Sequence, residues 1–216
     1  MNKRQQCWVR ASFALVAFVM LGYLVKFYPE VLQPFDTKIQ SAIRGNLPLP
    51  LTTFFKAITV IGNTGTQIVI AITAVLSLFL KKWYAEALYV MANSIFVAIC
   101  ILSLKYIYQR PRPSISHLVH ASGYSFPSGH SMGTFLIIGS FLVICFQRLN
   151  SKVVKWTVAI FLGLLIVCIG LSRIYLGVHY PTDVIAGFVL AYGIHNLCFP
   201  YYAQKRFEWR FQSKQK

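Results

Sequence analysis

Six apolar stretches recur along the chain, and each is close to the length at which an α-helix crosses a lipid bilayer. They run from 12 to 28, 58 to 80, 84 to 104, 130 to 146, 154 to 171 and 184 to 199. A helix needs roughly 17–25 apolar residues to span the hydrocarbon core. In lipid every backbone N–H and C=O must be satisfied within the segment, which favours helices joined by short links. We therefore predict an all-α integral membrane bundle of six transmembrane helices, with residues 1–216 forming a single domain.

The composition supports a membrane protein. Hydrophobic residues make up 56% of the chain and charged residues only 12%, against a charged share of about 25% in ordinary soluble domains. The first apolar stretch follows the basic start MNKRQQCWVR and has no small-residue cleavage site after it, so we expect a retained anchor. The five cysteines are scattered without metal-ligand or redox spacing, which favours a packing role.

The net charge of +16 raises the question of a nucleic-acid partner, and the distribution of the charge argues against one. Basic residues near the ends of spanning helices mark the cytoplasmic side. With both termini cytoplasmic, 13 basic residues fall on that side and 8 on the other. We therefore expect a multi-pass cell-membrane protein whose basic residues set its orientation and contact anionic headgroups, with no nucleic-acid partner.

Three polar segments flank these stretches, and the number of crossings places them on one face of the membrane. They read KYIYQRPRP at 105–113, SFPSGHS at 125–131 and SRIYLGVHYPTD at 172–183. Two spans separate the second and third segments, so their helix ends lie on the same side, and the charge count makes that side the outer one. We expect the three segments to meet in one pocket at headgroup depth.

The residue types in this pocket suit a phosphoryl group. Lys105, Arg112 and Arg173 can neutralise phosphoryl oxygens, and the planar guanidinium fork matches phosphate geometry. Ser128 and Gly129 open the fourth predicted helix, where free N–H groups and the helix dipole favour an anion. These five residues are the predicted phosphate-binding set.

Two histidines and one carboxylate are left for bond making and breaking. His179 and Asp183 are four residues apart, which places them on one face if the segment is helical; Asp183 could instead cap the following helix. In either geometry the carboxylate would fix the tautomer of His179 and leave its other nitrogen as a nucleophile. His130 would then donate a proton to the leaving oxygen and later activate water.

Other polar residues have simpler explanations. Arg110, Lys38 and Lys56 read as anchors at helix ends, and Asp183 is expected to be the only acidic residue in the cluster. His117 and His120 have an i, i+3 spacing with no further ligand nearby, so we predict no metal site. The segment from 35 to 55, with prolines around it, is expected to lie along the outer surface, where it could form part of a route for a lipid tail.

The three segments together resemble the signature of the type 2 phosphatidic acid phosphatases, also called lipid phosphate phosphatases. That signature is K-x6-RP, PSGH and SR-x5-H-x3-D, and every position is filled between 105 and 183. The resemblance implies a metal-independent hydrolase without a cofactor. It implies that His179 is the nucleophile that forms a phosphohistidine, Asp183 its orienting group and His130 the acid and base. The small bacterial members of the family that the chain resembles are phosphatidylglycerophosphatases and undecaprenyl-diphosphatases.

A lipid phosphate is therefore the expected substrate, hydrolysed on the extracytoplasmic face. The main alternative is a transporter that binds or flips a lipid phosphate in the same basic pocket, since binding needs cations but not a nucleophile. A vanadate-dependent haloperoxidase shares this type of site, but those enzymes are soluble and larger. The sequence does not fix the lipid or the oligomeric state.

Overall fold

The computed structural model describes residues 1–215, and every regular element within them is helical, as predicted. The helices are α1 (Lys3–Phe27), α2 (Pro29–Arg44), α3 (Leu49–Thr59), the 3-10 turn η1 (Val60–Gly62), α4 (Thr64–Leu80), α5 (Tyr84–Tyr108), α6 (Gly129–Arg148), α7 (Lys152–Tyr175) and α8 (Pro181–Phe211). Lys216, which was counted among the cytoplasmic basic residues, lies outside the described residues.

Within residues 1–215, five helices are long and apolar enough to cross a membrane, namely α1, α5, α6, α7 and α8. The predicted stretch from 58 to 80 is not a single helix, because α3 and η1 meet α4 at a 52° bend. The bend falls at Asn63, whose backbone is extended. Gly62 lies just before it, and a Cβ on Gly62 would stand 2.6 Å from Cδ2 of His130, so glycine permits this close approach. Counting the bent pair as one span gives up to six.

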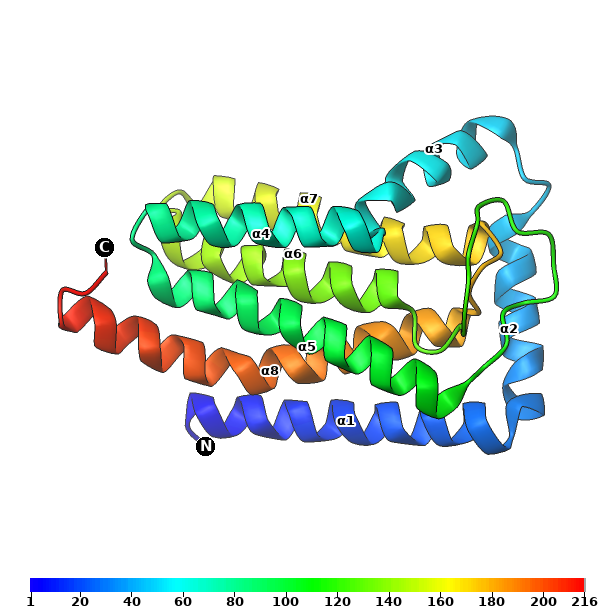
Figure 1. The fold of residues 1–216 in the computed structure, drawn as a ribbon, viewed down its shortest axis with the longest axis horizontal. Coiled ribbons are helices and arrows are strands. Elements are labelled where there is room, and N and C mark those ends of the chain that lie inside the picture. Colours follow the sequence, from blue (N-terminus) through cyan, green and yellow to red (C-terminus); the bar gives the residue numbers. More distant parts are fainter. Residues whose placement is uncertain (216) are drawn as a thin grey trace.

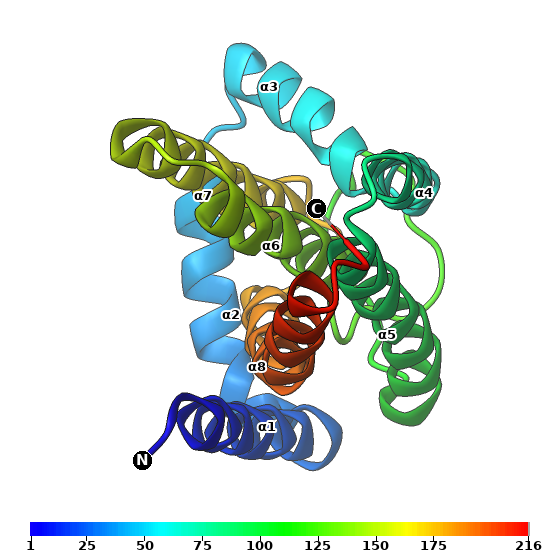
Figure 2. The same ribbon diagram turned by 90° about the vertical axis from the view of Figure 1, so that its left-hand side faces the viewer.

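The inner helices of the bundle are α6 and α8, whose apolar, membrane-spanning parts are 56% and 50% buried. The view along the bundle shows α1, α5 and α7 around this pair, with α1 lying against α8 (Figure 2). A core cluster joins α1, α6 and α8 through the buried side chains of Phe18, Met132, Leu136 and Leu190, together with Phe126 of the loop before α6. This packing holds the N-terminal ends of α6 and α8 side by side.

The two termini lie at one end of the bundle, and the polar segments lie at the other (Figure 1). The loop from 109 to 128 and the turn from 176 to 180 share that second end with α2, which runs across it roughly at right angles to the spanning helices. The structure therefore agrees with the prediction that the three segments share one face.

Helix α2 presents a polar side chain to the protein interior. Its buried residues are Leu32, Asp36 and Gln40, and their spacing of four places them on one face of the helix. That face lies against α7 and α8. A carboxylate at 1% exposure needs partners to offset its desolvation, and those partners belong to the polar site.

Candidate active site

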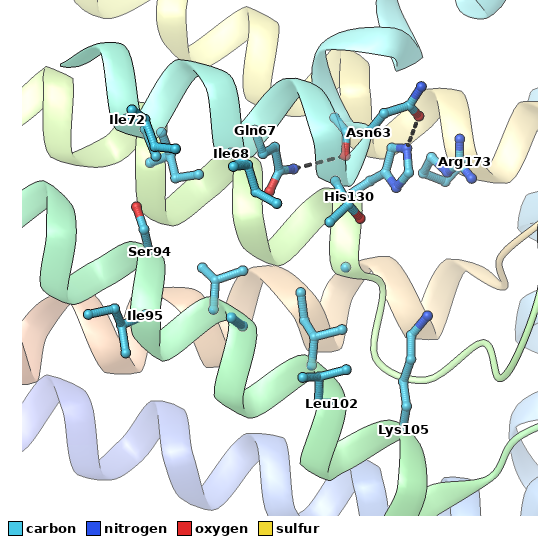
Figure 3. A pocket seen from close by; sticks show the side chains of 18 of the residues that line it. Asn63, Gln67, Ile68, Ile72, Ser94, Ile95, Leu102, Lys105, His130 and Arg173 are labelled. Atoms are coloured by element: carbon cyan, nitrogen blue, oxygen red, sulfur yellow. Dashed lines mark hydrogen bonds between the residues drawn. The ribbon is translucent and has the colours of Figure 1, made fainter. Parts of the chain in front are cut away.

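A cavity of about 790 Å³ opens at the end of the bundle that carries the polar segments. One part of its wall is basic and polar, and the other is formed by apolar side chains of α4 and α5 (Figure 3). Six of the eight predicted site residues line it, namely Lys105, Arg112, Gly129, His130, Arg173 and His179. Asp183 and Ser128 lie behind this wall and are fully buried.

His179 is held at the junction between the turn after α7 and the start of α8. Its Nδ1 lies 3.3 Å from Oδ2 of Asp183. The same oxygen accepts the backbone N–H of Tyr180 at 2.9 Å, which caps the first turn of α8. The N-cap of α8 is Tyr180 and not Asp183. From the third position of the helix, the carboxylate of Asp183 binds the backbone of the N-cap residue and orients His179.

The second ring nitrogen of His179 faces the cavity beside Arg112. Nη1 of Arg112 lies 3.4 Å from Nε2 of His179, and a guanidinium can only donate. Nε2 therefore carries the lone pair, and Nδ1 carries the proton that it shares with Asp183. Burial lowers the pKa of His179 to about 4, because the cost of desolvating the imidazolium and the nearby Arg173 and Arg112 outweigh the raising effect of Asp183.

The turn before His179 is closed by the backbone of Arg173. The carbonyl of Arg173 accepts the N–H groups of Val178 at 3.2 Å and His179 at 3.3 Å. Gly177, which lies between Arg173 and Val178 in the sequence, has a φ of 79°, a conformation that glycine adopts without strain. The C-terminal end of α7 and the turn that follows it thus carry both Arg173 and His179.

Three cations approach the cavity from different elements. Arg173 reaches it from α7, and its Nη1 donates to the hydroxyl of Thr59 at 2.6 Å. Its Nε is buried and has no hydrogen-bond partner among the described residues. Lys105 lies on the opposite side of the pocket, on α5 (Figure 3). Arg112 is fixed by backbone carbonyls, including that of Val178 at 2.6 Å.

His130 is oriented by a residue that the sequence did not single out. Nε2 of His130 donates to Oδ1 of Asn63 at 2.9 Å, at the bend before α4 (Figure 3). This leaves Nδ1 for proton exchange. Ser128 caps α6 instead of lining the cavity, since its hydroxyl accepts from the backbone and side chain of Ser131. Gly129, at the first position of that helix, does line the cavity.

Arg110 was predicted to be a snorkelling anchor, and this prediction is wrong. Its side chain is 7% exposed and bridges two buried carboxylates, Asp183 at 2.6 Å and Asp36 at 2.8 Å. Its guanidinium also lies over the ring of Tyr180, 4.0 Å from the centroid. Asp183 is therefore not the only acidic residue in the cluster. The anchor reading failed because an aspartate on α2, far away in sequence, reaches the same place.

Asp36 was not marked by the sequence pattern. Leu32, Asp36 and Gln40 recur every four residues and share one face of α2, but two of the three are polar, so the pattern did not indicate that this face is buried. Lys38 and Lys56, by contrast, are exposed, in keeping with their predicted role as anchors.

The two histidines of the loop have different surroundings. Nε2 of His117 lies 2.9 Å from the carbonyl of Pro113, while His120 lines the cavity. Within residues 1–215 no three His, Cys, Asp or Glu side chains are grouped so that they could hold a metal ion. The segment from 35 to 55 contributes no residue to the cavity wall, whose apolar part comes instead from α4 and α5.

The arrangement can therefore bind an anion against three cations and offer it two histidines. One histidine has a free lone pair and a carboxylate behind it, which is the geometry of an activated nucleophile. The other can donate and accept a proton. The apolar part of the same cavity can hold a hydrocarbon chain attached to that anion.

Comparison with known proteins shows which proteins this chain resembles. Phosphatidylglycerophosphatase B from Bacillus subtilis (strain 168) is 46% identical over 90 residues, 40% of this chain and 43% of that protein. Undecaprenyl-diphosphatase BcrC from the same organism is 38% identical over 98 residues, 43% of this chain and 46% of that protein. The matched segments thus span less than half the length of these two relatives.

A solved structure extends the similarity over nearly the whole fold. The crystal structure of a transmembrane PAP2-type phosphatidylglycerolphosphate phosphatase from Bacillus subtilis superposes with a TM-score of 0.82 at 26% identity, covering 90% of this chain and 96% of that one. The sequence model of the PAP2 superfamily matches residues 68–207. Since this match spans more than half of the 216 residues and includes all three polar segments, the chain belongs to the PAP2 superfamily.

Proposed function

We propose that the protein is a metal-independent membrane phosphatase that hydrolyses a lipid phosphate, either a phosphomonoester or a diphosphate, on the extracytoplasmic face. The observation that carries this proposal is the position of His179, whose lone pair faces three cations at the polar end of a cavity with an apolar wall. Binding a lipid phosphate requires the cations alone. The carboxylate behind His179 and the second histidine favour hydrolysis over transport.

The first step would transfer the phosphoryl group to His179. Nε2 attacks phosphorus, the bond from phosphorus to the leaving oxygen breaks, and protonated His130 gives its proton to that oxygen. The leaving oxygen is the ester oxygen of a phosphomonoester or the bridging oxygen of a diphosphate, which departs as the lipid monophosphate. The imidazole ring then carries a positive charge, which Asp183 stabilises through Nδ1–H. Lys105, Arg112 and Arg173 balance the charge that builds up on the phosphoryl oxygens.

The second step would regenerate the enzyme. His130, now neutral, takes a proton from water while the water oxygen attacks phosphorus. The nitrogen to phosphorus bond breaks and inorganic phosphate leaves. His179 returns to its neutral form with the proton on Nδ1, held by Asp183 at 3.3 Å.

The apolar wall of the cavity supports a lipid as the substrate. It consists of side chains from two facing helices, including Ile68, Ile72, Ile95, Ala98 and Leu102. A second cavity of about 620 Å³ shares Val75 and Met91 with the first and continues between α4 and α5 toward the opposite end of the bundle. This path suits a long hydrocarbon chain, such as those of undecaprenyl diphosphate or phosphatidylglycerol phosphate.

The placement on the extracytoplasmic face rests on the distribution of charge. The end of the bundle with the termini carries the larger number of basic residues, which marks the cytoplasmic side. The site lies at the other end (Figure 1). The substrate would therefore be a lipid phosphate presented in the outer leaflet.

Phosphate release by purified protein in detergent, with a chelator present, tests the proposal. The panel contains undecaprenyl diphosphate, phosphatidylglycerol phosphate and phosphatidic acid. Wild-type protein should release phosphate from at least one of them, and rapid acid-free quenching with radiolabelled substrate should trap label on the protein. His179→Ala should abolish both signals. If neither protein releases phosphate while both move a lipid phosphate across vesicles, the transporter reading replaces the phosphatase.

A further inference from the structure

Asp36 belongs to a continuous chain of buried charged side chains that ends at His179. Oδ2 of Asp36 accepts from Nη2 of Arg110 at 2.8 Å, and Nη1 of Arg110 donates to Oδ1 of Asp183 at 2.6 Å. The other oxygen of Asp183 reaches Nδ1 of His179 at 3.3 Å. The signs therefore alternate along the chain: negative, positive, negative and then the imidazole.

The contacts of Asp36 fix this chain to α2 and α8. Its Oδ1 accepts the backbone N–H of Thr182 at 2.9 Å, and its Oδ2 also accepts the hydroxyl of Thr182 at 2.8 Å. The same hydroxyl accepts from Nη1 of Arg110 at 2.8 Å. Asp36 and Asp183 are 1% and 0% exposed and Arg110 is 7% exposed. Water screens such a group weakly, so its charges act on each other strongly.

The charge balance gives Asp36 a role that hydrogen bonding alone does not require. Arg110 contacts Asp183 more closely than His179 does, so an isolated pair of Arg110 and Asp183 would be neutral as a whole. Asp36 restores a net charge of −1 to the three groups. The imidazole that they support gains a positive charge when its Nε2 bonds to phosphorus.

We propose that Asp36 is a positioning residue that acts through Arg110. Its carboxylate keeps the net charge of the Asp36–Arg110–Asp183 group negative, which stabilises the phosphorylated imidazole of His179. This inference rests on the proposed phosphatase function, and Asp36 itself lies outside the cavity wall. Asp183 therefore has three roles: its carboxylate caps the first turn of α8, orients His179, and links His179 to Arg110 and, through it, to Asp36 on α2.

Among the residues that the structure describes, the other charged or titratable groups that share the cavity with His179 are positive or neutral. They are Arg112 and His120 from the loop, Arg173 from α7, Lys105 from α5 and His130 from α6. Helix α2 itself contributes the neutral Gln40, whose amide donates to the carbonyl of His179 at 3.4 Å. The negative charge available to the imidazole thus comes from Asp183 and Asp36.

Two substitutions with opposite electrostatic effects test the proposal. Asp36→Asn removes a negative charge and keeps the shape of the side chain. Arg110→Gln removes a positive charge and keeps a shorter side chain that can still form hydrogen bonds. NMR of 15N-labelled histidine reads the pKa of His179 directly and works even if the protein releases no phosphate. Removing one charge on the order of 10 Å away, at an effective dielectric constant of about 20, shifts a pKa by roughly one unit.

We expect Asp36→Asn to lower the pKa of His179 by about one unit and Arg110→Gln to raise it. The double variant should fall between the two. In the active enzyme, Asp36→Asn should lower kcat about tenfold, matching one pKa unit, with KM little changed. Asp36→Glu should recover part of the lost turnover, because it restores the charge.

Glu86 offers a matched control at the other end of the bundle. It is also fully buried and is paired with Arg148 at 2.8 Å and Arg206 at 3.0 Å. Glu86→Gln should lower stability while leaving the pKa of His179 in place. If Asp36→Asn and Arg110→Gln move that pKa in the same direction, or if neither moves it, Asp36 does not act on His179 by charge and the proposal fails. Absence of phosphate release from wild-type protein would count against the phosphatase function instead.

Discussion

Arg173→Ala is expected to slow turnover by about a hundredfold to a thousandfold. Arg173 is 4% exposed. Its backbone carbonyl closes the turn that carries His179, and the substitution leaves this carbonyl in place. An arginine offers five N–H donors, and here one contacts Thr59 while the buried Nε has no partner among the described residues. A phosphoryl oxygen would satisfy that donor.

The size of the effect follows from when this contact forms. A buried donor without a partner costs on the order of 1–3 kcal/mol, and the bound phosphoryl group removes that cost as its oxygens gain charge. Loss of a preorganised electrostatic contact to a developing charge costs about 2.7–4 kcal/mol in the activation free energy. The reduction should appear in kcat. Arg173→Lys should be intermediate, since it keeps the charge but loses the planar fork.

Steady-state phosphate release in detergent gives kcat and KM for both variants. Arg44→Ala is the matched control, because Arg44 binds the carbonyls of Tyr175 and Ser116 at the same end of the bundle but does not line the cavity. It should lower stability and leave kcat near the wild-type value. A raised KM with unchanged kcat in Arg173→Ala would show uniform substrate binding and refute the argument.

Three further predictions concern the pH dependence, the packing of α6 against α8, and the apolar wall of the cavity. Since the pKa of His179 is lowered to about 4, kcat/KM should fall as the pH drops through about 4; the free energy of unfolding should begin to decrease already below the unfolded pKa of about 6.5, as chemical denaturation across that range would measure. Gly187→Ala places a Cβ 2.9 Å from the carbonyl oxygen of Ser128, so it should lower the melting temperature and activity together by separating α6 from α8. Ala98→Trp, which narrows the apolar part of the cavity, should raise KM for long-chain lipid phosphates and leave KM for a short-chain soluble analogue unchanged. Equal effects on both KM values would argue against a hydrocarbon chain in this part of the cavity.

The residues that contact the cavity were predictable because their chemistry is local to helix ends. Lys105, His130 and Arg173 each sit within a turn of a boundary that apolar periodicity marks, and the order of the spans brings these ends together. Asn63 was not predictable in the same way. The stretch around it is one apolar run in the sequence, and the close approach of Gly62 to His130 at the bend is a tertiary contact.

The network behind the site needed tertiary information for a different reason. Arg110 and Asp36 are 74 residues apart, and at the level of sequence each resembles an ordinary surface charge near a helix end. Only the passage of α2 across the end of the bundle (Figure 1) places the two in contact. A buried aspartate needs partners to offset its desolvation, and only the folded arrangement shows that Arg110 and Thr182 supply them.

The spacing within the third segment follows from hydrogen bonds that the structure resolves. The carbonyl of Arg173 binds the N–H groups of Val178 and His179, which sets the interval between the cation and the nucleophile. The interval from His179 to Asp183 runs from the residue before the N-cap to the third residue of α8, and one carboxylate oxygen binds both the backbone of Tyr180 and the imidazole. One inserted residue in the first interval would break the closed turn, and one in the second would rotate the carboxylate by about 100° around the helix. Either change would separate the imidazole from its support while leaving every residue type present, so the intervals are as necessary to the proposed chemistry as the side chains themselves.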